Sequence, residues 1–209
     1  MADGNRISVV VCGEDRATAN FGYHLLMARR TSGRPFVVDE PKPSIHFPPP
    51  GQGSGRQRLD REIVPKFLKA HRSLANANPR KGLLVVLDGD SDTRDERLKT
   101  LAEAIQGNGL PALDESDKRV CVLVARREIE CWQIVLRGGP RSEETFGRLE
   151  MTKKADAHDC KPLVRKYLGS TRSDAKAFAE NLPGVPVAQW LSSMNESAKA
   201  YLDWEQNYA

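Results

Sequence analysis

The chain lacks any long apolar segment. Among its 209 residues, apolar runs such as 7–11 (with one serine), 83–87 and 120–125 are all far shorter than the roughly 18–20 residues that a membrane-spanning helix needs. The first six residues show no basic region followed by the long apolar stretch of a secretory signal. We therefore expect no membrane segment and a cytoplasmic location.

Cysteine and the common nucleotide motifs are also scarce or missing. The four cysteines form no C-x-x-C pair, which argues against a zinc knuckle and a disulfide scaffold. Neither G-x-x-x-x-G-K-[ST] nor G-x-G-x-x-G occurs, so autonomous binding of ATP or a dinucleotide is not expected. The four histidines are dispersed and no serine lies in a nucleophile elbow, so hydrolysis by a serine or cysteine nucleophile has no support.

The composition is that of a soluble globular protein, with 39% hydrophobic and 29% charged residues. The net charge of +4 hides an uneven distribution. Residues 52–82 contain eight Lys/Arg and two acids, whereas residues 83–117 contain three Lys/Arg and nine acids. A basic segment is therefore followed directly by an acidic one.

Apolar strand-like runs alternate with helical patterns in the first two thirds of the chain. The runs 6–13, 81–87 and 119–125 are rich in Val, Leu and Ile, and each is followed by a segment with helical spacing. A short strand is also expected at 35–39. This alternation predicts an α/β fold with a mostly parallel sheet flanked by helices.

The domain organisation follows from the same pattern. Residues 1–140 form the predicted α/β core, with an irregular Pro/Gly-rich loop at 41–55. Residues 141–209 contain helical signals without aliphatic strand runs, so we expect a helical C-terminal extension. Its aromatic side chains are expected in the protein's own core rather than in contact with a partner: Tyr167, Phe178, Trp190, Tyr201 and Trp204.

Residues 56–78 have the apolar stripe of a helix that Pro65 kinks or restarts. The other side of this helix is basic. A solvated helix surface and a contact with a nucleic-acid backbone would look the same in the sequence. The candidate nucleic-acid-binding residues are Arg58, Arg61, Lys69 and Arg72.

Acidic residues follow three of the predicted strands. Glu14 follows the first, Asp88-Gly-Asp90-Ser-Asp92 follows the central one, and Glu128 and Glu130 follow the third. Ligands gather at the carboxyl ends of parallel strands, and carboxylates placed together repel one another unless a cation neutralises them. Hard oxygen ligands select Mg²⁺ or Mn²⁺, so the sequence predicts a divalent metal site.

Some of these acids could have roles that need no metal. Glu14 alone could be a helix cap, and Glu128 and Glu130 could face solvent in the first turn of a helix. Thr93 and Glu96 form a predicted capping box, so the three aspartates before them are not needed as caps. A calcium loop is rejected because Thr93 and Lys99 stand where glycine and glutamate would be needed.

These motifs resemble a TOPRIM domain, and the chain is most similar to small TOPRIM-like proteins of bacterial defence islands, relatives of the nuclease domain of the overcoming-lysogenization-defect (OLD) family. VVVCGEDRATANFGYHLL (9–26) resembles the strand, glutamate turn and helix of that group. LLVVLDGDSD (83–92) resembles its Asp-x-Asp strand end, and ARREIECW (125–132) its Glu-x-Trp element. The resemblance covers about residues 6–137.

The resemblance implies that Glu14, Asp88 and Asp90 bind Mg²⁺, or that Glu14 acts as a general base. Asp92 or Glu130 could complete a second metal position. Relatives also use a lysine beyond the acidic core, for which Lys153, Lys154 and Lys161 are candidates. Relatives often work beside a separately encoded ATPase, so such a partner is implied by analogy.

Three functional hypotheses follow. The first is a Mg²⁺-dependent nuclease, the effector of a phage-defence or toxin-like system, that cleaves DNA or tRNA. The second is a haloacid-dehalogenase-like phosphatase with Asp88 as nucleophile, although that family has its motif near the start of the domain. The third is a non-catalytic adaptor subunit of an ATPase complex, whose acidic site is structural.

Overall fold

The computed structural model describes residues 7–34, 36–38, 45–46, 55–66, 68–69, 81–90, 92–110, 120–142, 144–146, 167 and 169–206. Two groups of predicted site residues lie outside these ranges, namely Arg72 and the candidate lysines Lys153, Lys154 and Lys161. Within the described part of the chain, no helix has both the length and the apolar character needed to cross a bilayer.

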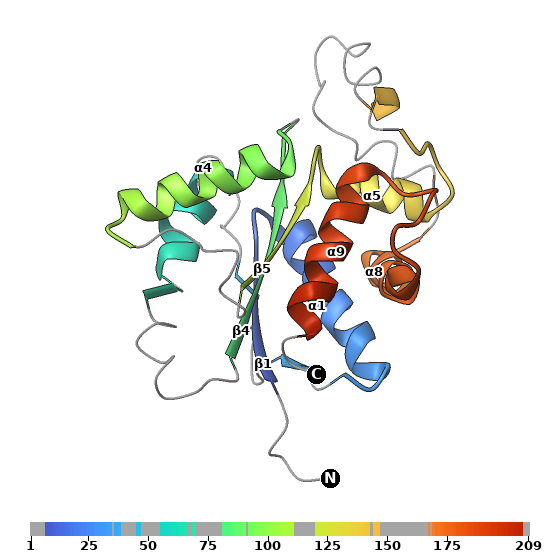
Figure 1. Ribbon diagram of the computed structural model, residues 1–209, viewed down its shortest axis with the longest axis horizontal. Coiled ribbons are helices and arrows are strands. Elements are labelled where there is room, and N and C mark those ends of the chain that lie inside the picture. Colours follow the sequence, from blue (N-terminus) through green and yellow to red (C-terminus); the bar gives the residue numbers. More distant parts are fainter. Residues whose placement is uncertain are drawn as a thin grey trace.

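A parallel sheet forms the centre of the fold (Figure 1). Its strands are β1 (Ile7–Gly13), β2 (Phe36–Val38), β3 (Ile45–His46), β4 (Lys81–Asp88) and β5 (Val120–Ala125). The order is β2–β1–β4–β5, β3 pairs with β1 as well, and all pairings are parallel. The prediction of a parallel α/β sheet is confirmed. The loop at 41–55, which was expected to be irregular, contains strand β3. The two residues of β3 pair with the carboxyl half of β1.

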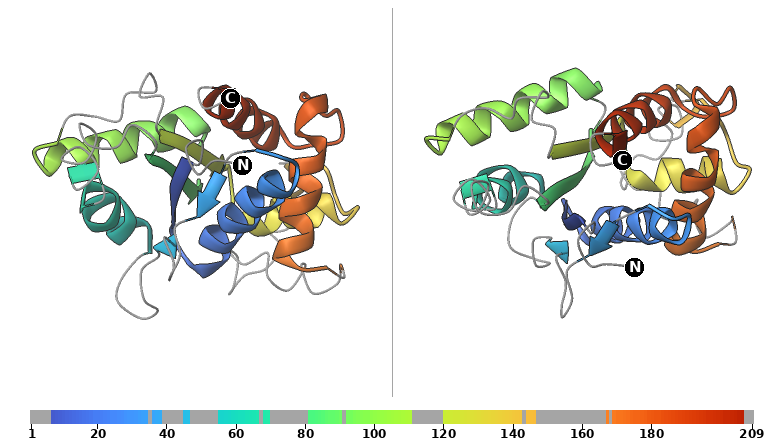
Figure 2. Two further views of the ribbon diagram at one scale, coloured as in Figure 1. Left: turned by 90° about the horizontal axis from the view of Figure 1, so that it is seen from below. Right: turned by 60° about the horizontal axis from the view of Figure 1, so that its bottom comes forward.

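Helices cover both faces of this sheet, on opposite sides in Figures 1 and 2. One face is covered by α4 (Arg94–Gly107) and by the short segment α2 (Gly55–Arg58) with the π-helix η2 (Leu59–Ile63). The other face is covered by α1 (Arg16–Thr31), α5 (Ile129–Leu136), α8 (Thr171–Asn181), η3 (Leu182–Gly184) and α9 (Ser192–Gln206).

The sequence of β4 explains why the sheet needs two covers. Every residue from Gly82 to Leu87 is buried, and side chains alternate between the two faces of a strand. Leu84 and Val86 belong to the core cluster under α1, whereas Leu83 and Val85 belong to the cluster under α4. A continuous apolar run is therefore the signature of a strand buried on both faces.

Pro65 explains the irregular start of the segment 56–78, where a helix kinked or restarted by this proline was expected. Proline has no N–H, and its ring clashes with the carbonyl four residues earlier in an α-helix. The chain avoids this conflict by forming the π-helix η2 just before Pro65, where the N–H of Val64 donates to the carbonyl of Leu59. The expected interruption is therefore a π-helical turn just before the proline, after which α-helical structure resumes at Val64.

The C-terminal helices share the core of the sheet. Phe178 of α8 stacks between Trp132 and Trp190, with ring centroids 5.5 and 4.7 Å apart. Phe178, Trp190, Tyr201 and Trp204 are all buried, as expected for the tail aromatics, and Tyr167 packs against the same core. The boundary at residue 140 stays a prediction, and one hydrophobic cluster contains residues from both sides of it.

Helix α9 lies along β5, the last strand of the described sheet. The hydroxyl of Ser197 accepts a hydrogen bond from the backbone N–H of Val124 at 3.0 Å and donates to its carbonyl at 3.2 Å. One side chain thus satisfies both main-chain groups of a strand residue that has no neighbour on this side among the described strands.

Candidate functional site

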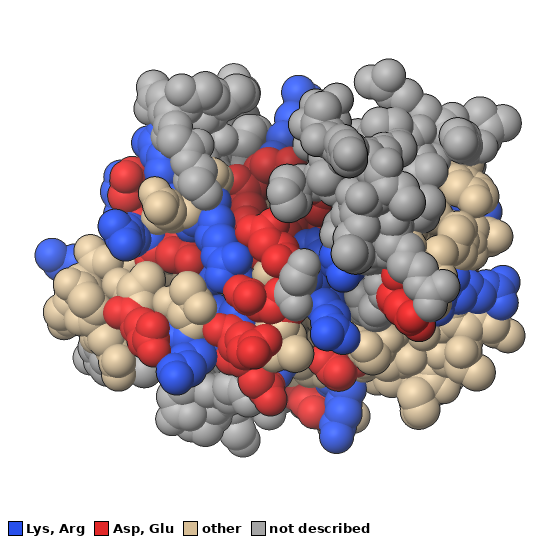
Figure 3. Space-filling view, turned by 90° about the horizontal axis from the view of Figure 1, so that it is seen from above, with Lys and Arg blue, Asp and Glu red and all other residues tan. Residues whose placement is uncertain are grey.

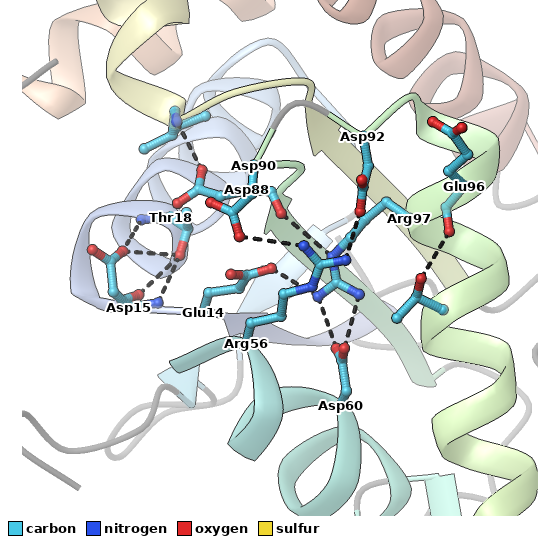
Figure 4. Close-up of polar contacts among 12 residues, drawn as sticks. Glu14, Asp15, Thr18, Arg56, Asp60, Asp88, Asp90, Asp92, Glu96 and Arg97 are labelled. Carbon is cyan, nitrogen blue, oxygen red and sulfur yellow. Dashed lines mark hydrogen bonds and ion pairs between the residues drawn. The ribbon is translucent and has the colours of Figure 1, made fainter. Parts of the chain in front are cut away.

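The carboxyl ends of β1, β4 and β5 bring Glu14, Asp88 and Glu130 into one region (Figure 4 labels the first two). Glu14 follows β1 directly, Asp88 is the last residue of β4, and Glu130 lies in the first turn of α5. The negative charges of Glu14 and Glu130 both act on Asp88. The three predicted acid clusters therefore contribute one residue each to a common site.

Glu14 is not the residue that caps helix α1. The N-cap of α1 is Asp15, whose Oδ1 accepts from the backbone N–H groups of Ala17 and Thr18 at 2.8 and 2.9 Å. Asp15 thus does the work that could have been assigned to Glu14. Glu14 is only 7% exposed. Burial raises its pKa from 4.5 to about 7, against the lowering effect of a neighbouring arginine, Arg97.

Asp88 is half-buried at the end of β4, and its carboxylate lies beside the start of α5. Its Oδ1 accepts from the backbone N–H of Ile129 at 2.8 Å, which is the first residue of that helix. Burial and then the charges of Glu14 and Glu130 raise the pKa of Asp88 well above its usual range. Like charges held this close favour either a proton or a bound cation.

Glu130 is buried, at 6% exposure. The alternative of a solvent-facing acid at the start of the helix is therefore wrong for this residue. The reason is the position of α5, which is buried from Ile129 to Val135 between the sheet and α8. Glu128, the N-cap residue, is half-buried and makes no side-chain cap.

Arginine 97 is the main site residue that the sequence analysis missed. Its guanidinium is fully buried and its Nη2 donates to Oε1 of Glu14 at 2.8 Å. Nη1 and Nη2 also donate to the two oxygens of Asp60, at 2.9 and 2.8 Å. Nε donates to the backbone carbonyl of Asp88 at 3.3 Å. Arg97 therefore connects β1, η2 and β4 at one point (Figure 4).

A signal for Arg97 was present in the sequence. Residues 97, 101 and 105 are spaced by four, and Leu101 and Ile105 form the buried stripe of α4. Arg97 continues this stripe by one turn towards the site. Asp60 similarly precedes the buried Val64 by four residues. A charged residue on an apolar stripe indicates a buried ion pair, but not its partner.

The Asp-x-Asp-x-Asp motif divides between two environments. Asp88 faces the buried acids, whereas Asp90 and Asp92 contact Arg56 of α2, with Arg56 Nη1 3.3 Å from Asp90 Oδ2 and Nη2 2.6 Å from Asp92 Oδ2. The side chain of Asp90 is 60% exposed, and its backbone has a φ of +50°, a conformation that Asp tolerates better than most residues. Asp90 was expected to bind the first metal ion with Glu14 and Asp88, and Asp92 was one of two candidates for a second metal position, but both contact a guanidinium instead.

Gly89 holds this motif against β5. Its N–H donates to the carbonyl of Ala125 at 2.6 Å, and its own carbonyl accepts from the N–H of Asp92 at 2.8 Å. A Cβ at this position would lie 2.7 to 2.9 Å from the carbonyl oxygens of Arg126, Ala125 and Asp92. Only glycine allows the backbone to pass so close, which fixes the directions of the aspartates on either side.

The predicted basic face is only partly described. Arg61 and Lys69 are exposed, and Arg58 makes an ion pair with Glu62 at 3.4 Å. Arg56, just before them in sequence, reaches the acidic motif. Figure 3 shows that acidic side chains at this end of the molecule lie among Lys and Arg side chains.

The donor set fits one mode of magnesium binding and not another. The described residues contain no group of three or more His, Cys, Asp or Glu placed to hold a metal ion, so they form no complete protein cage. Mg²⁺ is commonly bound by one or two carboxylates, with water and substrate phosphate as its other ligands. Glu14 and Asp88, two hard oxygen donors that repel each other, fit that mode.

Comparison with known proteins adds no relationship. The chain matches no family model, no curated protein and no solved structure.

Proposed function

We propose that this protein is a Mg²⁺-dependent nuclease. The observation that carries the proposal is the pair Glu14 and Asp88, two carboxylates at the ends of adjacent parallel strands, where burial raises the pKa of both and the charge of Glu14 raises that of Asp88 further. Glu14 and Asp88 would hold the ion, with Glu130 nearby to tune its charge. Bound Mg²⁺ would supply charge stabilisation and activation of water for phosphodiester cleavage.

Arg56 supports a phosphate-containing substrate. Its side chain is 22% exposed at the outer side of the acidic site, and the guanidinium is held by the exposed carboxylates of Asp90 and Asp92. Guanidinium groups bind phosphate with two parallel hydrogen bonds. In the proposed complex Arg56 exchanges one of these carboxylates for a substrate phosphate, while Arg58, Arg61 and Lys69 extend the basic surface along the nucleic acid.

The biological setting is proposed from the resemblance to TOPRIM proteins of defence islands. An effector of a phage-defence or toxin-like system, acting in the cytoplasm on DNA or tRNA beside a separately encoded ATPase, is consistent with the order of the Glu14 and Asp88-Gly-Asp90 motifs. The substrate and the ATPase partner are part of this proposal.

One observation favours a second candidate, the non-catalytic adaptor. Arg97 already neutralises Asp60 and part of the charge of Glu14, as expected if the acidic residues are structural. The two candidates differ in what they require of Asp88. Its described contact is a hydrogen bond accepted from a backbone N–H, which the amide oxygen of asparagine could also accept, whereas a metal site needs the charge of the carboxylate.

The test is a cleavage assay with plasmid DNA and total tRNA in Mg²⁺ or Mn²⁺. Glu14→Gln and Asp88→Asn should each lower the rate by about 10²-fold or more, as is typical when a group that stabilises transition-state charge is removed. The matched control is Glu103→Gln, an exposed acid on α4, which should retain full activity. Absence of cleavage, or cleavage unaffected by both site variants, contradicts the nuclease. An acyl-phosphate trapped at Asp88 would instead support the phosphatase.

A further inference from the structure

We infer that Arg97 is a positioning residue, which fixes the carboxylate of Glu14 relative to Asp88 so that the two can share one metal ion. The inference rests on the proposed function and adds the residue that organises the site. It also assigns Asp60 as the anchor of Arg97 rather than as a metal ligand.

Arg97 binds Asp60 and Glu14 in different ways. Both oxygens of Asp60 accept from the guanidinium, whereas Arg97 engages Glu14 through Oε1 alone. Asp60 is thus held by a forked, two-bond pair, the geometry that best defines orientation. Among the described residues, Glu14 is held at one oxygen, which leaves the other for a metal ion.

Arg97 also fixes the carboxylate of Glu14 relative to the end of β4. Nε donates to the main-chain carbonyl of Asp88, while Nη2 donates to the side chain of Glu14. The guanidinium is planar and rigid, so these two contacts place the backbone of one predicted ligand and the carboxylate of the other in a single frame. Rotation of Glu14 away from Asp88 would break one of the hydrogen bonds.

The π-helix η2 provides the fixed end of this frame. Asp60 lies within it and is 4% exposed. The conflict of Pro65 with an ordinary helix determines where the wider turn forms, and π-helical turns are often found at functional sites. Arg97 therefore links the π-helix η2, whose position depends on Pro65, to the predicted metal ligands.

Protein groups that hydrogen-bond to metal ligands, and so orient them, typically contribute 10- to 100-fold in metal affinity. The variant R97M/D60N removes one positive and one negative charge together, so the net charge near the ion is unchanged and no unpaired carboxylate is left at position 60. The readout is the Kd for Mn²⁺, measured by calorimetry on the full chain. A matched control is R137M/D174N, which removes a buried forked pair between α5 and α8.

We expect R97M/D60N to fold and to bind Mn²⁺ about 10- to 100-fold more weakly than the wild type, and R137M/D174N to keep the wild-type Kd. Arg97→Lys keeps the charge but loses the fork, so its Kd should also rise, and this variant decides the matter if R97M/D60N does not fold. A Kd within about threefold of wild type in the folded variant overturns the inference and leaves the nuclease proposal standing. Failure of the wild type to bind Mn²⁺ overturns the nuclease proposal instead.

Discussion

Arg29 and Glu205 form a forked ion pair across 176 positions of the sequence, with Nε 2.8 Å from Oε1 and Nη2 2.5 Å from Oε2. Arg29 lies near the end of α1 and Glu205 near the end of α9, and both side chains are almost completely buried. Arg34 adds a contact with Oε2 at 3.3 Å. The pair attaches the C-terminal helix to the first helix of the core.

Glu205→Gln should destabilise the protein by about 3–5 kcal/mol, because Arg29 would keep a buried charge without its counter-ion. The measurement is the free energy of unfolding in urea. R29M/E205L, which removes both charges, should be much closer to wild type. If the single and double variants lose the same free energy, packing rather than charge determines the contribution of this pair.

Glu14 makes stability depend on pH. Its pKa is higher in the folded protein, about 7, than the usual 4.5, so the folded state binds the proton more tightly. The stabilisation is present below about pH 4.5 and is lost as the pH rises through about 7. With about 1.4 kcal/mol per unit, the loss from Glu14 is on the order of 3 kcal/mol.

Urea unfolding of wild type and Glu14→Gln in EDTA across this pH range measures the effect. The wild type should lose stability relative to the variant as the pH rises, and Glu103→Gln should follow the wild type. Parallel curves for wild type and Glu14→Gln would show that Glu14 does not titrate in this range.

Ser197→Ala should cost about 1–3 kcal/mol, since it leaves the buried N–H and carbonyl of Val124 without their side-chain partner. Urea unfolding gives the magnitude, and amide hydrogen exchange at Val124 localises it. Ser192→Ala, at an exposed position of the same helix, is the control and should change stability little. Unchanged exchange at Val124 would contradict the assigned role.

Gly89→Ala should destabilise the protein by about 1–3 kcal/mol, because the added methyl group meets three carbonyl oxygens that belong to the backbone and cannot turn aside. It should also weaken Mn²⁺ binding, since Asp88 must move with the loop. Gly107→Ala on α4 has open space around it and serves as the control. Wild-type stability and Mn²⁺ affinity in Gly89→Ala would show that the loop adapts.

Arg56→Ala should weaken nucleic-acid binding and lower the slope of log K against log salt by about 1, as expected for the loss of one phosphate contact. Fluorescence anisotropy with a labelled oligonucleotide in EDTA measures binding without cleavage. Arg172→Ala, an exposed arginine on α8, should leave the slope unchanged. Equal slopes for wild type and Arg56→Ala would remove Arg56 from the interface.

Local patterns predicted the parts of this fold that local physics determines. The capping box of α4 is present, with the N–H of Thr93 2.8 Å from Oε2 of Glu96 and the N–H of Glu96 3.3 Å from Oγ1 of Thr93. The aliphatic runs became the buried strands β1, β4 and β5. Since the carboxyl ends of parallel strands meet at one edge, the proximity of Glu14 and Asp88 could also be predicted.

The partners of the charged residues could not be predicted in the same way. Arg97 and Asp60 are 37 positions apart, and their pairing depends on how α4 and η2 pack on one face of the sheet. Arg56 meets Asp92 across 36 positions for the same reason. The adjoining basic and acidic segments showed that opposite charges were available, whereas tertiary packing decided which of them met inside the site.

The contact between α9 and β5 also restricts how copies of this chain can associate. An open strand edge is a template for pairing with another chain, and proteins protect such edges by covering them. Here Ser197 already engages the main-chain groups of Val124, and α9 lies in the path of any incoming strand. Among the described strands, assembly by strand addition is therefore directed to the opposite side of the sheet, where β2 lies, and the C-terminal helix protects β5 against edge-to-edge aggregation.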